Sequence, residues 1–242
     1  VTAKATVSVV AIAKIAAGSQ FSCALSTEAR LYCAGLGYGP LAKPLAPDKR
    51  FVSVTVDGIG VDGHGCAIAS DGSSYCWGAN ANGELGVGDS ASRVEPTRVA
   101  GGLTFASISV GRFHTCAVTT QGDPYCWGSG CEGRLGAGDT ISRPVPTRVI
   151  GGMRFNQIQA GANATCGVEI SGQAYCWGRN DLGQLGNNGV VGGNLGDFVP
   201  TPVPVSSAAS TAQIVTKGPR SCLLNRDGRA FCFGNNTVFE LG

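Results

Sequence analysis

The feature that most constrains this chain is a pair of cysteines ten positions apart, which occurs five times along 242 residues. The pairs are Cys23 with Cys33, Cys66 with Cys76, Cys116 with Cys126, Cys166 with Cys176 and Cys222 with Cys232. In units two to four, the second cysteine is followed by Trp-Gly and a glycine-rich loop that ends in Leu-Gly. An identical spacing repeated in this way indicates a repeat protein.

The segment between the two cysteines of each unit is predicted to be a β-hairpin. In the second unit, runs with β-branched and aromatic residues flank residues 70–72, Ser-Asp-Gly, which is typical of a hairpin loop. A type I turn closed by Gly72 in the left-handed region places Cys66 opposite Cys76, at a separation close to what a disulfide needs. Ala29 replaces the turn glycine in the first unit, so a different turn or strain is expected there. The glycine recurs as Gly122, Gly172 and Gly228.

Aromatic residues flank the second cysteine of almost every unit. Tyr32, Tyr75, Tyr125, Tyr175 and Phe231 precede it. Trp77, Trp127, Trp177 and Phe233 follow it, and Ala34 is the exception. Because side chains alternate across a strand, the cysteines face one side of the sheet and the aromatic rings the other. We expect the rings to pack between neighbouring sheets; the alternative is an exposed aromatic binding groove.

A complete unit contains four short strands, and the hairpins recur at intervals of 43, 50, 50 and 56 residues. Repeated four-stranded sheets of this length are the blades of a β-propeller. We therefore predict an all-β propeller of five blades in a single domain, residues 1–242. Residues 1–10 are predicted to supply the fourth strand that the last unit lacks and so to close the ring. The repeats are placed around 11–48, 51–99, 103–149, 153–203 and 212–242, with a proline-rich loop at 35–48.

The eleven cysteines indicate an oxidising compartment, since ten of them form matched pairs. Zinc sites favour spacings of two to four residues, which these pairs do not have. Each bridge closes a loop of about ten residues and is worth roughly 2.5–3 kcal/mol in the chain-entropy account. Cys131 is left over, as a stray thiol or as one half of an intermolecular bond.

Charge and hydropathy exclude two classes of partner. The net charge is +2 and no cluster of five or more basic residues occurs, so nucleic-acid binding is not expected. The most apolar run, residues 7–17, is too short to cross a bilayer and contains Lys14, so membrane insertion is not expected. A secretion signal or a longer parent chain would lie outside this sequence.

Three motifs of the third unit resemble the repeat of the RCC1 family (regulator of chromosome condensation). They are Gly-x-x-His-Thr-Cys-Ala-Val at 111–118, Tyr-x-Trp-Gly at 125–128 and Gly-x-Leu-Gly-x-Gly at 133–138. The resemblance covers nearly the whole chain and implies a β-propeller, in that family typically of seven blades. Its founding member is a nuclear exchange factor that contacts chromatin; the paired cysteines and the lack of a basic patch argue against that activity here. The Tyr-Cys-Trp-Gly motif resembles a secreted, disulfide-containing bacterial branch, which includes an inhibitor that caps β-lactamases with one propeller face.

The sequence contains no recognisable catalytic motif, so no enzyme activity, cofactor or metal is expected. His64 and His114 both stand two residues before the first cysteine of a hairpin, and this shared register predicts scaffold hydrogen bonding. Asp89 and Asp139 both follow Gly-x-Gly and are predicted to cap turns, because their loops offer too few other oxygens for calcium.

The leading hypothesis is a secreted or cell-surface recognition or adhesion propeller that binds a protein or glycan through loops on one face. It could form the tip of a larger surface fibre and would then be oligomeric. The alternatives are an inhibitor of a secreted enzyme and a structural surface subunit. Because propeller function belongs to variable loops on a regular frame, residues that break the repeat are the candidate ligand contacts, and each could equally be an ordinary solvated residue. They are Tyr38, Arg112, Phe113, Arg134, Arg179, Asn180, Asp181 and Phe198.

Overall fold

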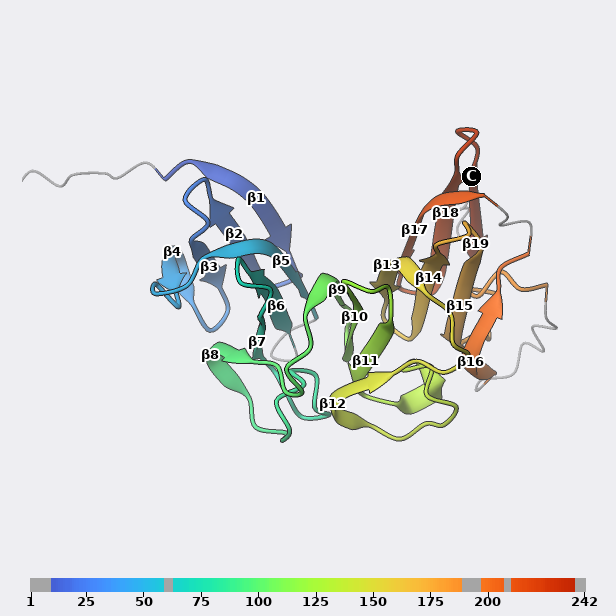
Figure 1. The fold of residues 1–242 in the computed structure, drawn as a ribbon, viewed down its shortest axis with the longest axis horizontal. Helices are drawn as coiled ribbons and strands as arrows, with labels where there is room; N and C mark the ends of the chain where they lie inside the picture. Colours follow the sequence, from blue (N-terminus) through green and yellow to red (C-terminus); the bar gives the residue numbers. More distant parts are fainter. Residues whose placement is uncertain (1–9, 59–62, 189–196, 207–209, 238–242) are drawn as a thin grey trace, which may run out of the picture.

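The computed structural model describes residues 10–58, 63–188, 197–206 and 210–237, and it consists of antiparallel sheets that follow one another along the chain (Figure 1). The first sheet contains β1 (Ile12–Ala17), β2 (Phe21–Ser26), β3 (Leu31–Gly35) and β4 (Gly39–Leu45). The second contains β5 (Phe51–Asp57), β6 (His64–Ala69), β7 (Ser74–Gly78) and β8 (Arg93–Arg98). The expected loop over 35–48 thus includes a strand, β4.

The remaining sheets repeat this order. The third contains β9 (Phe105–Val110), β10 (His114–Thr119), β11 (Pro124–Gly128) and β12 (Arg143–Arg148). The fourth contains β13 (Phe155–Ala160), β14 (Ala164–Glu169), β15 (Ala174–Arg179) and β16 (Phe198–Pro204). The fifth has three described strands, β17 (Thr211–Lys217), β18 (Arg220–Asn225) and β19 (Ala230–Gly234). Within the described residues, no helix could cross a membrane.

The first strand of every sheet is the innermost one. β1, β5, β9, β13 and β17 contact one another in succession, and the later strands of each sheet lie progressively further out. This is the arrangement of propeller blades around a common axis, so the predicted fold class is confirmed. We call the sheets the first to fifth blades and the interface between two consecutive blades a seam.

All five predicted disulfides form between directly paired residues of β-hairpins, with Cα–Cα distances of 4.1 Å. They join Cys23 to Cys33, Cys66 to Cys76, Cys116 to Cys126, Cys166 to Cys176 and Cys222 to Cys232. Each blade therefore has its own bridge, and none of these bridges connects two blades. The remaining cysteine, Cys131, has a free and exposed thiol.

The hairpin turns between the paired cysteines also follow the sequence. In the second blade Cys66 lies directly opposite Cys76, and the turn has Gly72 at φ +83°. The first blade departs as expected, because Ala29 takes this left-handed conformation at φ +62°. An alanine in that region is strained relative to glycine.

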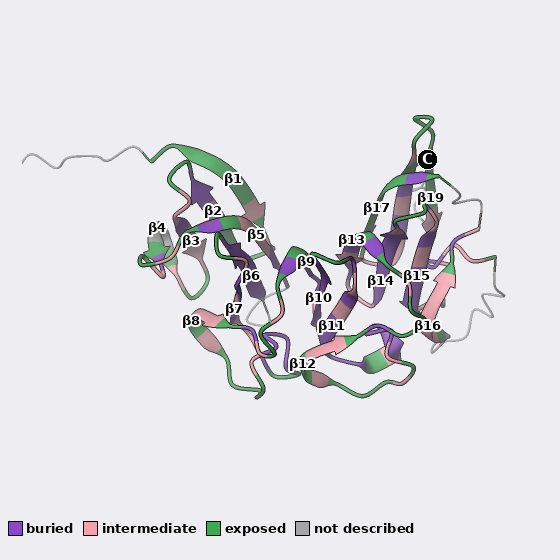
Figure 2. Ribbon diagram, viewed as in Figure 1, coloured by how far each residue is buried: buried purple, intermediate pink, exposed green. Residues whose placement is uncertain are grey.

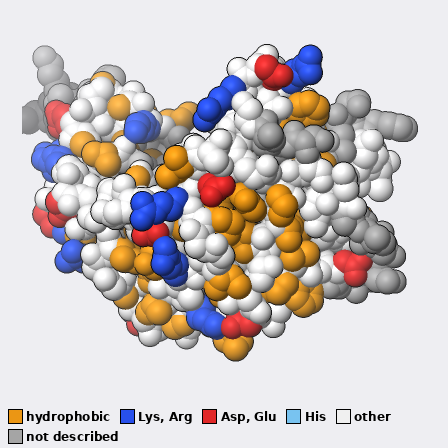
Figure 3. All heavy atoms as spheres, turned by 45° about the vertical axis from the view of Figure 1, so that its right-hand side comes forward, with side chains coloured by type: hydrophobic (Ala, Val, Ile, Leu, Met, Phe, Trp, Pro, Cys, Tyr) orange, Lys and Arg blue, Asp and Glu red, His pale blue; other side chains and the backbone are white. Residues whose placement is uncertain are grey.

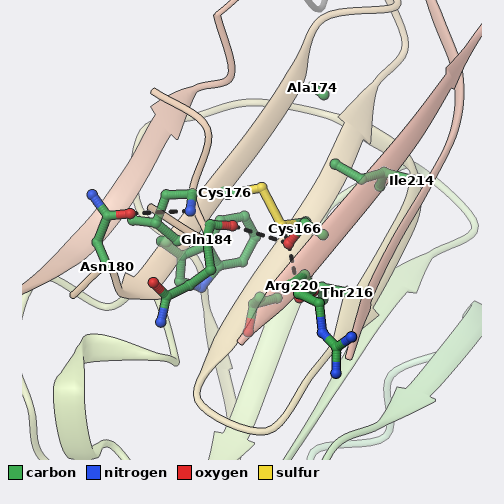
Figure 4. Close-up of a disulfide and its surroundings, with 12 residues drawn as sticks. Cys166, Ala174, Cys176, Asn180, Gln184, Ile214, Thr216 and Arg220 are labelled. Atoms are coloured by element: carbon green, nitrogen blue, oxygen red, sulfur yellow. Dashed lines mark hydrogen bonds between the residues drawn. A yellow bond between two sulfur atoms is a disulfide. The ribbon is translucent and has the colours of Figure 1, made fainter. Parts of the chain in front are cut away.

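Each seam joins the disulfide face of one blade to the aromatic face of the next. Cys66 and Cys76 of the second blade lie in one buried cluster with Phe105 and Trp127 of the third. The Cys166–Cys176 disulfide likewise faces β17, where Ile214 lies in one buried cluster with Cys166 and Cys176 (Figure 4). All three tryptophans are fully buried at the seams, as predicted, whereas Phe231 of the last blade is 42% exposed.

Buried hydrogen bonds reinforce the seams between the second and fifth blades. The Thr115 hydroxyl donates to the Glu84 carbonyl of the preceding blade (2.9 Å), so His64 Nε2–H of that blade donates to Thr115 Oγ1 (2.8 Å). The next seam repeats this with His114, Thr165 and the Arg134 carbonyl. In the last seam the Ser221 hydroxyl donates to the Gln184 carbonyl (3.0 Å). The predicted scaffold role of both histidines is confirmed.

Among the described residues, no neighbouring blade covers the outward face of the first blade or of the fifth. Ile15 of β1 is 80% exposed, whereas Ile158 and Ile214 at the same register are 2% and 0% exposed. Figure 2 shows β1 largely exposed beside the buried middle strands of the central blades. The predicted closing strand at residues 1–10 lies, apart from Val10, outside the described residues.

Removing a disulfide should cost more in a central blade than in the last one. In a variant with both Cys116→Ala and Cys126→Ala, the chain loses about 2.5–3 kcal/mol of loop-closure stabilisation and also packing at a fully buried seam. The matched variant with Cys222→Ala and Cys232→Ala loses the same loop-closure stabilisation. The sulfurs removed there face no neighbouring blade among the described residues. Urea denaturation of both should show the larger drop in midpoint for the central pair; equal drops would contradict this account of the seams.

The buried histidines should make the fold sensitive to mild acid. Burial lowers the pKa of His64 from about 6.5 to about 3, and its Nδ1 has no hydrogen-bond partner. The unfolded chain therefore binds a proton that the folded chain does not, and stability is lost as pH falls below 6.5. For one histidine the loss between pH 7.5 and 5.5 is about 1.4 kcal/mol.

A His64→Gln variant keeps a donor for Thr115 but cannot titrate. Urea titrations at pH 7.5 and 5.5 should therefore show a smaller pH-dependent loss for this variant than for the wild type. An unchanged pH dependence would rule out His64 as its source. Carboxyl groups with lowered pKa values, such as those of Asp89 and Asp139, change the stability of the fold only below about pH 4. They therefore do not contribute to the difference between pH 7.5 and 5.5.

Candidate functional site

The turns that follow the innermost strands of all five blades meet at one end of the propeller. They enclose a cavity of about 440 Å³, which we call the central mouth. Each blade contributes to its wall, through Ser19, Asp57, Arg112, Ala162 and Lys217 respectively. A second cavity of about 260 Å³ adjoins it and shares Arg112 and Ala162 in its wall. The arrangement brings together residues up to two hundred positions apart in the chain.

Arg112 is held at the wall common to both cavities. Its backbone N–H donates to the Gly161 carbonyl of the next blade (3.1 Å), and its guanidinium lies 4.7 Å from the centroid of the Phe113 ring. The preceding residue must be glycine, because a Cβ on Gly111 would lie 2.3 Å from the Gly161 oxygen. The Arg112 Nε is buried and has no hydrogen-bond partner.

The other cations around the central mouth are neutralised by carboxylates. Arg134 pairs with Glu132 (2.9 Å), Arg179 pairs with Asp181, and Lys217 of the fifth blade pairs with Asp57 of the second (3.6 Å). No ion pair joins Arg112 to a carboxylate among the described residues. Of the two cations that line the central mouth, Lys217 has a carboxylate partner and Arg112 has none in the described part of the chain.

Arg134 supports the wall from inside. The residue is 4% exposed, and its side chain donates to the carbonyls of Cys131 (2.8 Å) and Ala162 (3.1 Å) and to the Glu132 carboxylate. Burial lowers the pKa of Arg134, and the neighbouring Glu132 opposes that shift. Its guanidinium also lies 5.8 Å from the Phe113 ring centroid, so one ring contacts the cations at positions 112 and 134.

The segment after β15 forms the other side of the smaller cavity. Asp181 is buried and accepts hydrogen bonds from Arg179 and Gln184, and the Arg179 hydrogen bond is the main reason that the pKa of Asp181 lies below its usual value. Arg179 also approaches Glu132 at 3.4 Å, which ties the third blade to the fourth. The side-chain amide oxygen of Asn180 (Oδ1) accepts the Leu185 N–H and so holds the loop.

The eight candidate ligand contacts thus separate into groups. Arg112, Phe113, Arg134, Arg179 and Asp181 lie together at or behind the two cavities, and Asn180 is buried in the loop beside them. Phe198 opens β16 opposite Arg179 and is 43% exposed. Tyr38 packs on Phe21 in another cavity, where burial raises its pKa to about 12. Their role in binding remains a prediction.

Sequence reasoning did not single out Asp57, Lys217 or Glu132. Asp57 and Lys217 both end the innermost strand of their blade, and that shared register is the signal which could have found them.

The loop aspartates behave as predicted. Asp89 and Asp139 accept the N–H groups of Ala91 and Ile141, respectively, and so cap their turns.

Comparisons with known proteins agree with this architecture. Residues 71–118, 121–168 and 171–217 match the family described as "Regulator of chromosome condensation (RCC1) repeat", and a second description of the same repeat matches 12–38, 105–134 and 155–184.

Solved structures of low sequence identity share the fold. Human WBSCR16 is 20% identical over 92% of this chain (TM-score 0.78). Prp20p of Saccharomyces cerevisiae is 22% identical over 96% of it (TM-score 0.79). The ectodomain of the Physcomitrella patens receptor kinase CR4 is 20% identical over 93% of it (TM-score 0.59). The chain spans 62%, 59% and 50% of these proteins' own lengths.

Replacing Arg134 should destabilise the fold more than replacing an exposed, ion-paired arginine. An Arg134→Met variant removes the side-chain hydrogen bonds to Glu132 and to the Cys131 and Ala162 carbonyls, at an expected cost of about 2 kcal/mol. The matched Arg143→Met variant breaks a more exposed pair with Asp139 and should cost less than about 1 kcal/mol. Thermal and urea denaturation test this. Equal losses would show that Arg134 is not a supporting element of the wall.

Proposed function

The chain belongs to the RCC1-repeat family, and on that premise we propose that it is an extracellular recognition propeller which binds a partner protein through the central mouth. In this proposal it acts by binding and not by catalysis. Secretion or display at a cell surface, as an adhesion module, is part of the proposal. The five disulfides support it, because bridges of this kind persist in oxidising compartments.

The observation that carries the proposal is the uncompensated charge of Arg112 between two cavities. A guanidinium with a free, partly buried donor edge favours a carboxylate, which it can bind with charge-assisted hydrogen bonds. The stacking of Arg112 on Phe113 restrains it in the free protein, so less conformational entropy is lost on binding. We therefore propose that an Asp or Glu side chain of the partner enters the central mouth and pairs with Arg112.

Two further observations favour a protein as the partner. The surface in Figure 3 carries Lys and Arg interspersed with Asp and Glu, with exposed hydrophobic side chains between them, which is a mixture found in protein interfaces. The structure of Prp20p was described with its binding properties to Gsp1p and histones, and a related structure shows Kap60 bound to yeast RCC1. Protein binding is thus an activity of structurally similar propellers.

Selection of random dodecapeptides displayed on phage against the oxidised protein tests the proposal. We expect the selected peptides to be enriched in Asp or Glu and to bind Arg112→Gln about ten- to a hundred-fold more weakly, as loss of a charge-assisted hydrogen bond requires. Arg226→Gln is the matched control, since Arg226 is an exposed cation in the turn between β18 and β19. Peptides without acidic enrichment, or with equal affinity for both variants, would overturn the assignment of the central mouth.

A further inference from the structure

The seam between the first and second blades is built differently from the next two. The connection from β3 to β4 is short, running only from Gly35 to Gly39, whereas the connection from β7 to β8 runs from Gly78 to Arg93. In the second and third blades, this longer connection reaches across the seam and lies on the following blade. The first blade has no such segment.

Glycine contacts show where the long connection lies. A Cβ on Gly83 would lie 2.5 Å from the Pro144 Cα, and a Cβ on Gly128 would lie 3.3 Å from the Glu84 Cα. Residues 83 and 84 of the second blade therefore rest against Pro144 and Gly128 of the third. The next seam repeats this arrangement, with Gly133 against Pro200 and Arg134 against Gly178.

The corresponding place in the first seam is a cavity. Gly78 pairs with Arg93 as Gly128 pairs with Arg143, so Gly78 and Val94 are the counterparts of Gly128 and Pro144. Both line a cavity of about 250 Å³, which we call the seam pocket. The seam pocket is thus the space that a loop fills in the next two seams.

The residues that line the first seam also differ in chemistry from their counterparts in the next two seams. In the next two seams the loop carbonyl accepts a threonine hydroxyl, which also binds a histidine. In the first seam Phe21 stands at the histidine position and Gly65 at the threonine position, so both polar partners are replaced. Because this wall has no hydrogen-bond donor at these two positions, burying a backbone carbonyl there would be unfavourable. An apolar group is favoured instead.

The mouth of the seam pocket is open and apolar. Leu36 is 48% exposed and Val94 is 68% exposed, and both line the pocket together with Phe21 and Tyr38. The cation in its wall, Arg93, is held by the Asp89 carboxylate at 2.6 Å. Exposed hydrophobic residues around a preformed pocket are typical of sites where a partner protein inserts an anchoring side chain.

We propose that the seam pocket receives one large apolar side chain, such as Trp, Phe or Leu, from a partner protein. The side chain inserts between the first and second blades. It occupies the place that corresponds to residues 83 and 84 in the seam between the second and third blades. This site uses neither Arg112 nor the central mouth, so it stands or falls independently of the function proposed above.

Backbone NMR of the oxidised protein tests the proposal with capped tripeptides as probes. Ac-Gly-Trp-Gly-NH2 should shift the amides of Gly63, Gly78 and Val94 in a saturable way, and Ac-Gly-Asn-Gly-NH2 should not. A Val94→Asp variant places a charge at the rim and should weaken binding about ten-fold, as burial of an apolar side chain beside a carboxylate is disfavoured. Val94 is largely exposed, so the substitution should leave the fold intact.

An Ile170→Asp variant is the matched control, because Ile170 is an equally accessible hydrophobic residue, 57% exposed, near the hairpin turn of the fourth blade. Binding to this variant should equal that of the wild type. Identical shifts with the Asn tripeptide, no shifts at the pocket, or an equal loss in both variants would overturn the proposal. Binding of free indole without binding of the Trp tripeptide would also overturn it, in favour of a small-molecule pocket.

Discussion

The contact on which the structure depends is the seam, where the disulfide face of one blade packs on the aromatic face of the next. A hairpin with a single disulfide is stabilised locally, but it leaves one apolar face on each side of its sheet. The seam buries both faces at once, with the cysteine sulfurs of one blade against the tryptophan of the following blade. Because the same register recurs in each unit, the same packing can be repeated, and an arc of sheets results. The exposed Ile15 shows what a blade face looks like without that cover.

Hydrogen bonds across a seam then help to fix the relative position of the two blades, which apolar packing specifies less strictly. The relay from histidine through threonine to a loop carbonyl requires the right residue on each of two blades and a loop long enough to reach the next blade. Where the loop is short, the histidine and the threonine are both replaced, by Phe21 and Gly65. In the first seam the short loop and the two replaced residues therefore occur together, so this interface is built on a different set of contacts. The resulting pocket and the central mouth are separate openings, one apolar and one bearing an uncompensated cation.

The repeat geometry also explains why charged groups gather at the central mouth. The innermost strands end at the same end of the propeller, so residues at or just after a strand end line the central mouth whatever their position in the chain. Asp57 and Lys217 meet for this reason, and Arg112 enters the same space. Carboxylates pair with several of these groups, and among the described residues Arg112 has no such pair. The proposed recognition thus follows from a balance of charges that no single blade contains.

From the sequence by itself one can derive the hairpins, all five disulfides, the opposite orientation of cysteines and aromatic rings, the scaffold role of both histidines and the propeller class. These features depend on alternation and turn geometry over about ten residues, which the spacing of residues specifies directly. The seam pocket and the pairing of Asp57 with Lys217 required the tertiary structure, as did the burial of Arg134, Asn180 and Asp181 behind the surface where the sequence placed them as candidate contacts. Local register determines how strands pair within a blade, but the rotation between blades and the path of each long loop depend on side-chain packing across seams, so only the folded chain shows which distant residues meet.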